Sequence, residues 1–244
     1  MMFTPTSLLP ANETKRLQTL RAYDILYSLQ EPLFTEFVEL TATLFNVPIS
    51  LIALVGADEV EYKAVHGLPD LRSQPRVEAI CSLAVKEQQA VIFTDLTQPN
   101  SLTAEAAADA QAKGLRFYAG APLCMPGGHC IGTLCLIDQQ PRTFSVPEQR
   151  LLEHLAQLAG QLIAVRRYCL AAPAAREEQW NLVRTELAWE VQALKALARY
   201  LFVYAGIHVP VPADILALVD RRLSDFRLKL RDEYPEALYP WSLL

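Results

Sequence analysis

The spacing of apolar residues changes repeatedly along the first part of the chain. Apolar side chains recur every three or four positions over 14–29 and 34–45, which indicates two helices, since such residues share one helix face. Residues 49–55 are an apolar run rich in branched side chains, and residues 60–66 alternate between apolar and polar, as strands do. The intervening residues 56–58 (GAD) are typical of a turn, so the two strands predict an antiparallel hairpin.

The middle of the chain continues this mixture of helices and strands. Residues 103–112 are alanine-rich and predict a helix that Gly114 ends. Residues 125–129 (MPGGH) suit a hairpin turn, because glycine readily adopts positive φ. The order favours an α+β fold with a mainly antiparallel sheet flanked by helices. The further elements that we expect here are a helix over 77–87, strands over 90–93, 116–123 and 130–137, and a long helix from Pro147.

The last seventy residues show helical spacing throughout. Pro173 should break or kink the long helix, since proline inside a helix removes a hydrogen bond. Residues 177–204 and 212–230 then place apolar side chains every three or four positions, and a proline-bearing connector separates them. Two helices joined in this way predict an all-α helical hairpin. The expected organisation is a first domain at 14–170, the helical hairpin at 176–234, and tails at 1–13 and 235–244.

Two segments carry the most specific sequence of the chain. They are residues 115–123 (LRFYAGAPL) and 131–138 (IGTLCLID), the second followed closely by Pro141 and Arg142. Together with 45–55 (FNVPISLIALV), they resemble the closing and opening strands of bacterial GAF domains, in the subgroup found beside histidine kinases and diguanylate cyclases. The resemblance covers residues 14–168. It implies a GAF-like sheet flanked by helices and a sensory role.

The segments that line the pocket in this subgroup differ here. Ser82 and Leu83 follow Cys81, where the subgroup usually has a histidine, and residues 95–102 (DLTQPNSL) lack the usual arginine and aromatic residue. We expect a mostly apolar pocket between the sheet and the helices of residues 77–115. By family position alone, the resemblance places these residues near it: Ile80, Cys81, Asp95, Phe117, Tyr118 and Cys135.

Composition and charge exclude several classes of protein. The chain of 244 residues has a net charge of −5 and a calculated pI near 5.5, and its densest basic stretch is interleaved with acidic residues. We therefore expect no nucleic-acid partner, which would require clustered basic side chains. Residues 1–10 lack the pattern of a signal peptide, and no apolar run is long enough for a membrane span. The prediction is a cytoplasmic protein without a membrane partner.

The cysteines give no sign of a disulfide framework or a metal centre. Their number is odd and their spacing irregular, which predicts reduced thiols. Neither Cys81 nor Cys135 has a lysine or histidine beside it in sequence that would lower a thiol pKa, so packing is favoured over thiol chemistry. Cys124 and Cys130 flank one hairpin with His129, but without the paired spacing of a zinc site. The five are Cys81, Cys124, Cys130, Cys135 and Cys169.

No catalytic motif is recognisable, and we predict neither catalytic residues nor a metal or cofactor. The predicted function is a non-catalytic sensory or regulatory GAF protein of bacterial signal transduction. It would bind an unknown small molecule, form a homodimer through its terminal helices, or do both. It would signal by contact or through a separate output protein. The helical hairpin would either mediate this dimerisation or only cover the GAF domain. Two alternatives stay open: a thiol-dependent GAF-fold enzyme such as free methionine-R-sulfoxide reductase, and a ligand-free scaffold for protein–protein interaction.

Overall fold

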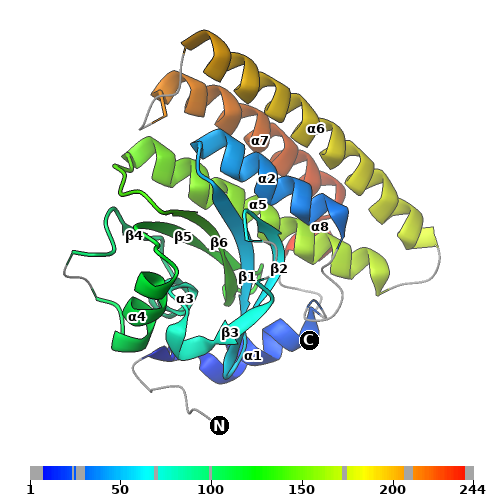
Figure 1. Ribbon diagram of the computed structural model, residues 1–244. Coiled ribbons are helices and arrows are strands. Elements are labelled where there is room, and N and C mark those ends of the chain that lie inside the picture. The colour runs from blue at the N-terminus through cyan, green and yellow to red at the C-terminus, as the bar shows by residue number, and fades with distance from the viewer. Residues whose placement is uncertain are drawn as a thin grey trace.

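The structure is a computed structural model that describes residues 8–23, 25, 31–68, 71–98, 101–171, 175–205 and 211–239, with only the backbone at 175–176 and 201–205. These residues form one six-stranded sheet with helices on both faces (Figure 1). The strands are β1 (Ile49–Val55), β2 (Glu59–His66), β3 (Ser73–Pro75), β4 (Val91–Phe93), β5 (Phe117–Cys124) and β6 (Cys130–Asp138). The helices are α1 (Glu13–Ala22), α2 (Pro32–Phe45), the 3₁₀ helix η2 (Arg76–Glu78), α3 (Cys81–Glu87), α4 (Ala104–Ala112), α5 (Val146–Leu170), α6 (Ala175–Ala205), α7 (Ala213–Glu233) and α8 (Pro235–Leu238).

The sheet has the strand order β3-β2-β1-β6-β5-β4, and every neighbouring pair is antiparallel. This confirms the α+β fold and both predicted hairpins, β1–β2 and β5–β6. Strand β3 was not expected, because its three residues lie in a polar stretch without apolar alternation. It pairs with β2 through the register Val60 to Gln74, which depends on backbone groups rather than on side-chain pattern.

Helices cover both faces of the sheet, so all seven residues of β1 are buried. Alternate side chains point to opposite faces. One set, which includes Ile52, Leu54 and Leu134, packs in a core with α2 and α5. The other set, which includes Leu51, Val55 and Tyr118, packs in a second core with Cys81 and Val85 of α3. We call these the helical-layer core and the α3 core.

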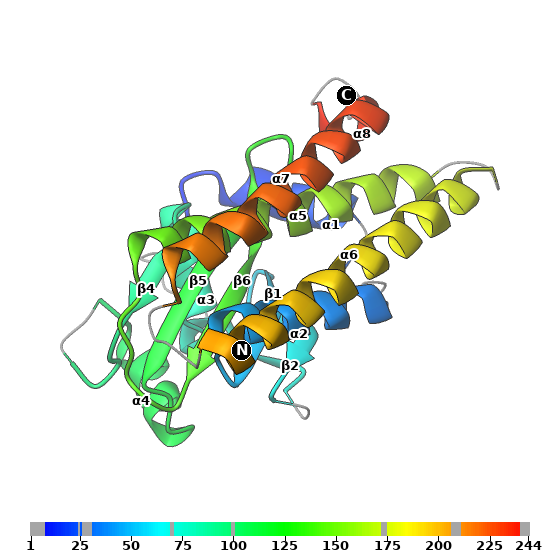
Figure 2. The same cartoon turned by 90° about the horizontal axis from the view of Figure 1, so that it is seen from above.

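The helical layer contains both C-terminal helices (Figure 2). Helix α6 packs mainly on α2, and α7 packs mainly on α5. The two helices are therefore not a hairpin that stands apart from the first domain. Ion pairs join them directly, Arg222 to Glu190 at 2.9 Å and Lys229 to Glu186. The predicted connector lies largely outside the described residues, as do the last part of the predicted helix 14–29 and the break at Pro173.

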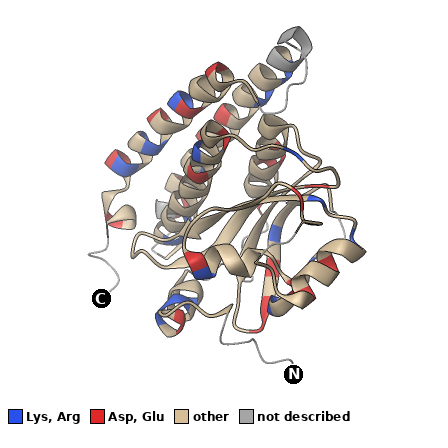
Figure 3. Ribbon diagram, turned by 90° about the vertical axis from the view of Figure 1, so that its left-hand side faces the viewer, with Lys and Arg blue, Asp and Glu red and all other residues tan. Residues whose placement is uncertain are grey.

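The predicted tails contain structure. Leu8 is buried, and α8, which contacts α5, begins at the first residue of the predicted C-terminal tail. The domain boundaries themselves stay a prediction. In the described part of the chain, no helix has the length and apolar character to cross a membrane. Charged side chains lie mainly on the helices, with both signs interspersed, whereas the strands carry few (Figure 3).

One buried carboxylate joins the sheet-flanking helices to the start of α7. Glu148 is fully buried and completes a capping box with Ser145 at the start of α5. It accepts hydrogen bonds from Arg142 Nη2 at 3.0 Å and from the backbone N–H of Val211 at 3.1 Å. Arg142 in turn donates to the carbonyl of Phe45, the last residue of α2, at 2.7 Å. Glu148 therefore fixes the ends of three helices at one point.

We expect Glu148→Gln to lower the free energy of unfolding by about 3–5 kcal/mol, because the amide leaves the charge of Arg142 buried without its partner. Urea unfolding of both proteins measures this difference. Glu153→Gln is the matched control on the same helix: Glu153 is half-buried and bonded to Gln149, so its loss should cost less than about 1 kcal/mol. Equal effects of the two substitutions would contradict this role of Glu148.

Candidate functional site

Two cysteines far apart in sequence meet in the α3 core. Cys135 lies in the middle of β6, and Cys81 begins α3. Their sulfur atoms are 3.5 Å apart and both side chains are buried. The strand register fixes the position of Cys135, which pairs with Leu51 of β1 and Gly120 of β5. The position of Cys81 is fixed by the short helix α3, which packs directly on β6.

Two hydroxyl groups complete this thiol cluster, which we define as Cys81, Cys135, Thr133 and Tyr118. Thr133 Oγ1 lies 2.9 Å from Cys135 Sγ, and the Tyr118 hydroxyl lies 3.2 Å from the same sulfur. Four polar side chains thus satisfy one another inside an apolar core that excludes water. A buried polar group needs such partners, because an unmade hydrogen bond is costly there.

The thiol cluster gives Cys81 and Cys135 different pKa values. Hydrogen bonding to the Cys135 thiol, helped by Thr133 and Tyr118, lowers the pKa of Cys81 to about 7 against the opposing effect of burial. Burial, which disfavours a charge in the core, raises the pKa values of Cys135 and Tyr118 well above their usual range, and the neighbouring thiols raise them further. Cys81 is therefore the group of the cluster that ionises first. No lysine or histidine is adjacent to Cys81 in sequence, and the group that lowers its pKa most is the thiol of Cys135.

Gly120 makes room for this arrangement. A Cβ atom at Gly120 would lie 2.3 Å from the Tyr118 hydroxyl and 2.8 Å from its Cζ atom. The ring of Tyr118 therefore lies back along its own strand, over residue 120, and reaches Cys135 there. Only glycine leaves that space free.

A pocket of about 530 Å³ opens beside the α3 core, between α4 and the segment that precedes it. We call it the α4 pocket. Leu96, Leu102, Ala110 and Leu115 belong both to its lining and to the α3 core, so the pocket adjoins the core that holds the thiol cluster. The other lining residues are small or polar and uncharged: Thr97, Gln98, Thr103, Ala104, Ala107 and Gln111.

Four of the six predicted site residues share the α3 core. Ile80, Cys81, Tyr118 and Cys135 all lie there, so the structure brings them together. None of the four is among the lining residues of the α4 pocket. Residues that the sequence analysis missed include Thr133 and Gly120, because only the strand register shows that they face the two cysteines.

Phe117 does not lie in this core. It packs on the opposite face of the sheet, in the helical-layer core, with its ring centroid 5.6 Å from that of Phe144. The guanidinium carbon of Arg142 lies 5.3 Å from the same ring centroid. Phe117 and Tyr118 are consecutive in a strand, so they point to opposite faces, and the structure does not bring Phe117 together with the other predicted site residues.

Asp95 lies at the surface and not among the thiols. Its carboxylate accepts two hydrogen bonds from Arg116, at 2.9 and 3.0 Å, and one from the backbone N–H of Thr97. The bonds from Arg116, followed by those from Thr97, hold the pKa of Asp95 well below its usual value. Because Leu96 and Thr97 line the α4 pocket, Asp95 supports the rim of this pocket instead of facing its interior.

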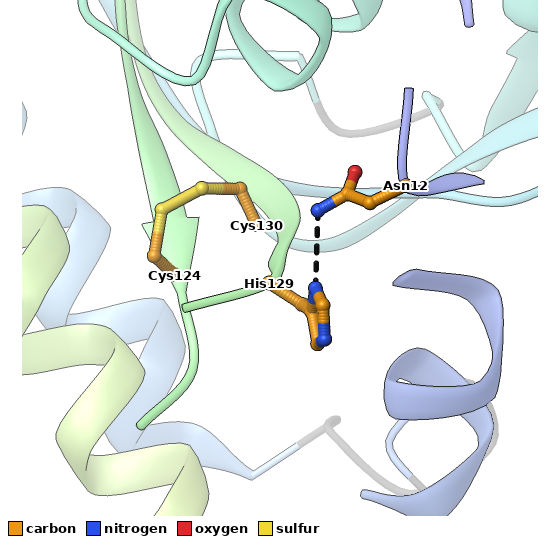
Figure 4. The surroundings of a disulfide bond; sticks show 4 residues. All are labelled: Asn12, Cys124, His129 and Cys130. Carbon is orange, nitrogen blue, oxygen red and sulfur yellow. Dashed lines mark hydrogen bonds between the residues drawn. A yellow bond between two sulfur atoms is a disulfide. The ribbon is translucent and has the colours of Figure 1, made fainter. Parts of the chain in front are cut away.

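The prediction that all cysteines are reduced thiols is wrong for one pair. Cys124 and Cys130 form a disulfide at the turn end of the β5–β6 hairpin (Figure 4). They are cross-strand partners with Cα atoms 3.8 Å apart, and the bond closes the loop that carries His129. His129 Nδ1 and Asn12 Nδ2 lie 3.1 Å apart, which links this loop to the start of α1. The free cysteines are Cys81, Cys135 and Cys169.

The described residues contain no group of three or more histidine, cysteine or acidic side chains arranged to hold a metal ion. The site offers instead a buried pair of thiols, of which Cys81 has the lower pKa, and an uncharged pocket beside it.

We expect Gly120→Ala to lower the free energy of unfolding by about 1–3 kcal/mol, because its Cβ would displace Tyr118. The displacement should also expose the thiol cluster, so Cys81 and Cys135 should react faster with a thiol reagent in the folded protein. Gly127→Ala is the control: its Cβ would meet no atom closer than 4.0 Å, and it should change neither property. Unchanged labelling rates in the Gly120→Ala protein would contradict the proposed packing.

Known proteins resemble part of this chain. A cyclic di-GMP phosphodiesterase from Pseudomonas aeruginosa is 29% identical over 150 residues, which are 61% of this chain and 25% of that protein. The chain thus corresponds to a quarter of that relative's length.

Two solved structures have similar folds. The GAF domain of an Acinetobacter phosphoenolpyruvate-protein phosphotransferase is 19% identical, with a TM-score of 0.47, covering 62% of this chain and 93% of that one. A free methionine-R-sulfoxide reductase from Neisseria meningitidis is 16% identical, with a TM-score of 0.45, covering 66% and 93%. The family model for the GAF domain matches residues 30–163, which include the whole sheet, the thiol cluster and the α4 pocket. The chain belongs to the GAF domain family.

Proposed function

We propose that this chain is a non-catalytic sensory domain of bacterial signal transduction, and that it binds a small, uncharged molecule in the α4 pocket. The observation that carries the proposal is the pocket itself. Its volume of about 530 Å³ is in the range of small-molecule sites, and apolar walls alternate with a few hydrogen-bonding side chains. Family membership supports it, since signalling proteins are among the relatives.

The lining of the pocket favours a neutral ligand. Thr97, Thr103 and Gln111 carry hydroxyl and amide groups, and no lysine, arginine, aspartate or glutamate is among the lining residues in the described part of the chain. A phosphate group is usually bound by cationic side chains or by several backbone N–H groups, so a cyclic nucleotide would lack its charged partners here. A nucleobase, a nucleoside or a similarly sized amide fits this chemistry better.

A ligand in this pocket could act on the rest of the fold through the sheet. Leu96 lines the pocket, and its backbone N–H donates to the carbonyl of Arg116 at 2.7 Å, next to the start of β5. Strand β5 contacts α5 on its other face. A ligand that prefers one position of Leu96 would thereby shift the population of arrangements in the helical layer, which a separate output protein would detect.

A second candidate function has one observation in its favour. Cys81 and Cys135 are close enough to be oxidised together, as a thiol-dependent reductase of free methionine sulfoxide would require. In that reaction, two thiols become one disulfide, and the sulfoxide oxygen leaves as water. Both thiols are buried, however, and neither lines the α4 pocket, so a substrate there would not contact them. For this reason we favour the non-catalytic function.

We expect no turnover of free methionine-R-sulfoxide by the purified protein supplied with dithiothreitol, measured as methionine formed. The Cys81→Ser and Cys135→Ser proteins should give the same background rate, since no catalysis depends on either sulfur. Turnover that is abolished by either substitution would replace the proposed function with the thiol enzyme.

We expect a thermal-shift screen to find stabilising ligands among purines, nucleosides and neutral amides, but not among cyclic nucleotides. A compound present at a hundred times its Kd adds about 2.7 kcal/mol to the free energy of unfolding. Ala107→Phe should abolish the shift, because Ala107 lines the pocket and the larger ring would occupy it.

Ala108→Phe is the matched control, since Ala108 is an exposed neighbour on the same helix and does not line the pocket. It should leave the shift unchanged. A shift of equal size in both variants would place the ligand elsewhere. If no compound stabilises the wild-type protein, the ligand-free scaffold is the better account.

A further inference from the structure

Helix α6 has two apolar faces, of which the described structure covers one. The covered face contains six residues at steps of three and four: Trp180, Val183, Leu187, Val191, Leu194 and Ala198. On the opposite side, Leu182, Trp189 and Tyr200 are 66%, 76% and 57% exposed. Thr185, Ala193 and Ala196 lie between them and are exposed too, so the six residues again step by three and four.

This second face, which we call the outer stripe, has the spacing of a helix–helix seam. Residues that recur at three and four positions stay on one side of a helix and pack against the same kind of row on a partner helix. An isolated exposed leucine needs no explanation, but a row with three large side chains in register does. Helix α6 is also the outermost element of the helical layer, so no other described element lies over the outer stripe (Figure 1).

A groove of about 510 Å³ adjoins the stripe. Its walls come from Pro32, Leu33 and Glu36 at the start of α2, and from α6. The α6 side includes Arg184, Ala188 and Trp189. Trp189, the most exposed large side chain of the outer stripe, therefore lies directly beside this mostly apolar groove. Trp189 and the groove lie side by side on one surface, so this surface is self-complementary. A two-fold axis between two copies would place Trp189 of each copy in the groove of the other.

Charges along α6 fix the direction of such a pair. Glu177 and Glu178 are exposed at the N-terminal end. At the other end Arg199 is 68% exposed, with its guanidinium 4.0 Å from Glu39 of α2. Glu186 and Glu190, which lie between, are already paired with Lys229 and Arg222 of α7. If two α6 helices cross antiparallel with Trp189 near the axis, residue 178 comes level with residue 200. The acidic end of each helix then faces the basic end of the other.

We propose that the outer stripe binds a second copy of this chain, with the two α6 helices antiparallel and each Trp189 seated in the groove of the other copy. The 31 residues of α6 span about 46 Å at 1.5 Å per residue, which is long enough for a standard interface of about 800 Å² per partner. A dimer that formed through α2 and α5 would need their outward surfaces, but α6 covers α2 and α7 covers α5. The dimer surface thus lies on the added helix rather than on the GAF helices.

Sedimentation equilibrium of the full chain tests this proposal. The wild-type protein should sediment at twice the 27.3 kDa of one chain. Trp189→Glu should raise the dimer Kd about thirtyfold or more, since a central aromatic anchor is lost. Leu228→Glu is the control, because Leu228 is 47% exposed on α7 and lies outside the stripe. It should not change the Kd. A monomeric wild-type protein, or equal effects of the two substitutions, would overturn the proposal.

A charge exchange tests the antiparallel direction separately. Glu178→Arg should weaken the dimer, because it places two cations together at both ends of the interface. Adding Arg199→Glu to the same chain should restore the affinity. If the double variant is as weak as the single one, the antiparallel arrangement is wrong. Both sites are exposed, so neither change should prevent folding.

Discussion

The buried carboxylate of Glu148 is the interaction on which the architecture depends. It caps α5, neutralises Arg142 and accepts the backbone N–H of Val211 just before α7. A charge of this kind is stable in a core only when all its partners are present, so the positions of three segments are fixed together. The consequence is that α7 is held in the same layer as α5, and α6 packs on α2 beside it. The C-terminal helices are thereby part of the folded domain.

The two faces of the sheet pack against different helices. The face toward α2 and α5 holds the helical layer together, whereas the face toward α3 contains the thiol cluster and adjoins the α4 pocket. Strands β5 and β6 contribute to both. The α4 pocket and the helical layer are therefore separated by one sheet.

Most of the fold could be predicted from the sequence, because apolar spacing reports which face an element buries. The β1–β2 and β5–β6 hairpins and the long helix were found in this way. The site was predicted less well. Family position grouped Phe117 with Tyr118 because it did not include the alternation of side chains in β5, which puts the two on opposite faces. The disulfide between Cys124 and Cys130 was missed because an odd cysteine count says nothing about cross-strand pairs. The approach of Cys81 to Cys135 and the partners of α6 and α7 depend on tertiary packing, which no local pattern contains.

The central claim is that the C-terminal helices and the sheet form one cooperative unit. Native-state hydrogen exchange measures this directly, because it gives a free energy of opening for each amide. The slowest amides of α7 should open with the same free energy as those of β6, and both should fall together as urea is added. Exchange of α7 at a much lower free energy, while β6 stays protected, would show that the helices are a separate module and would contradict the account.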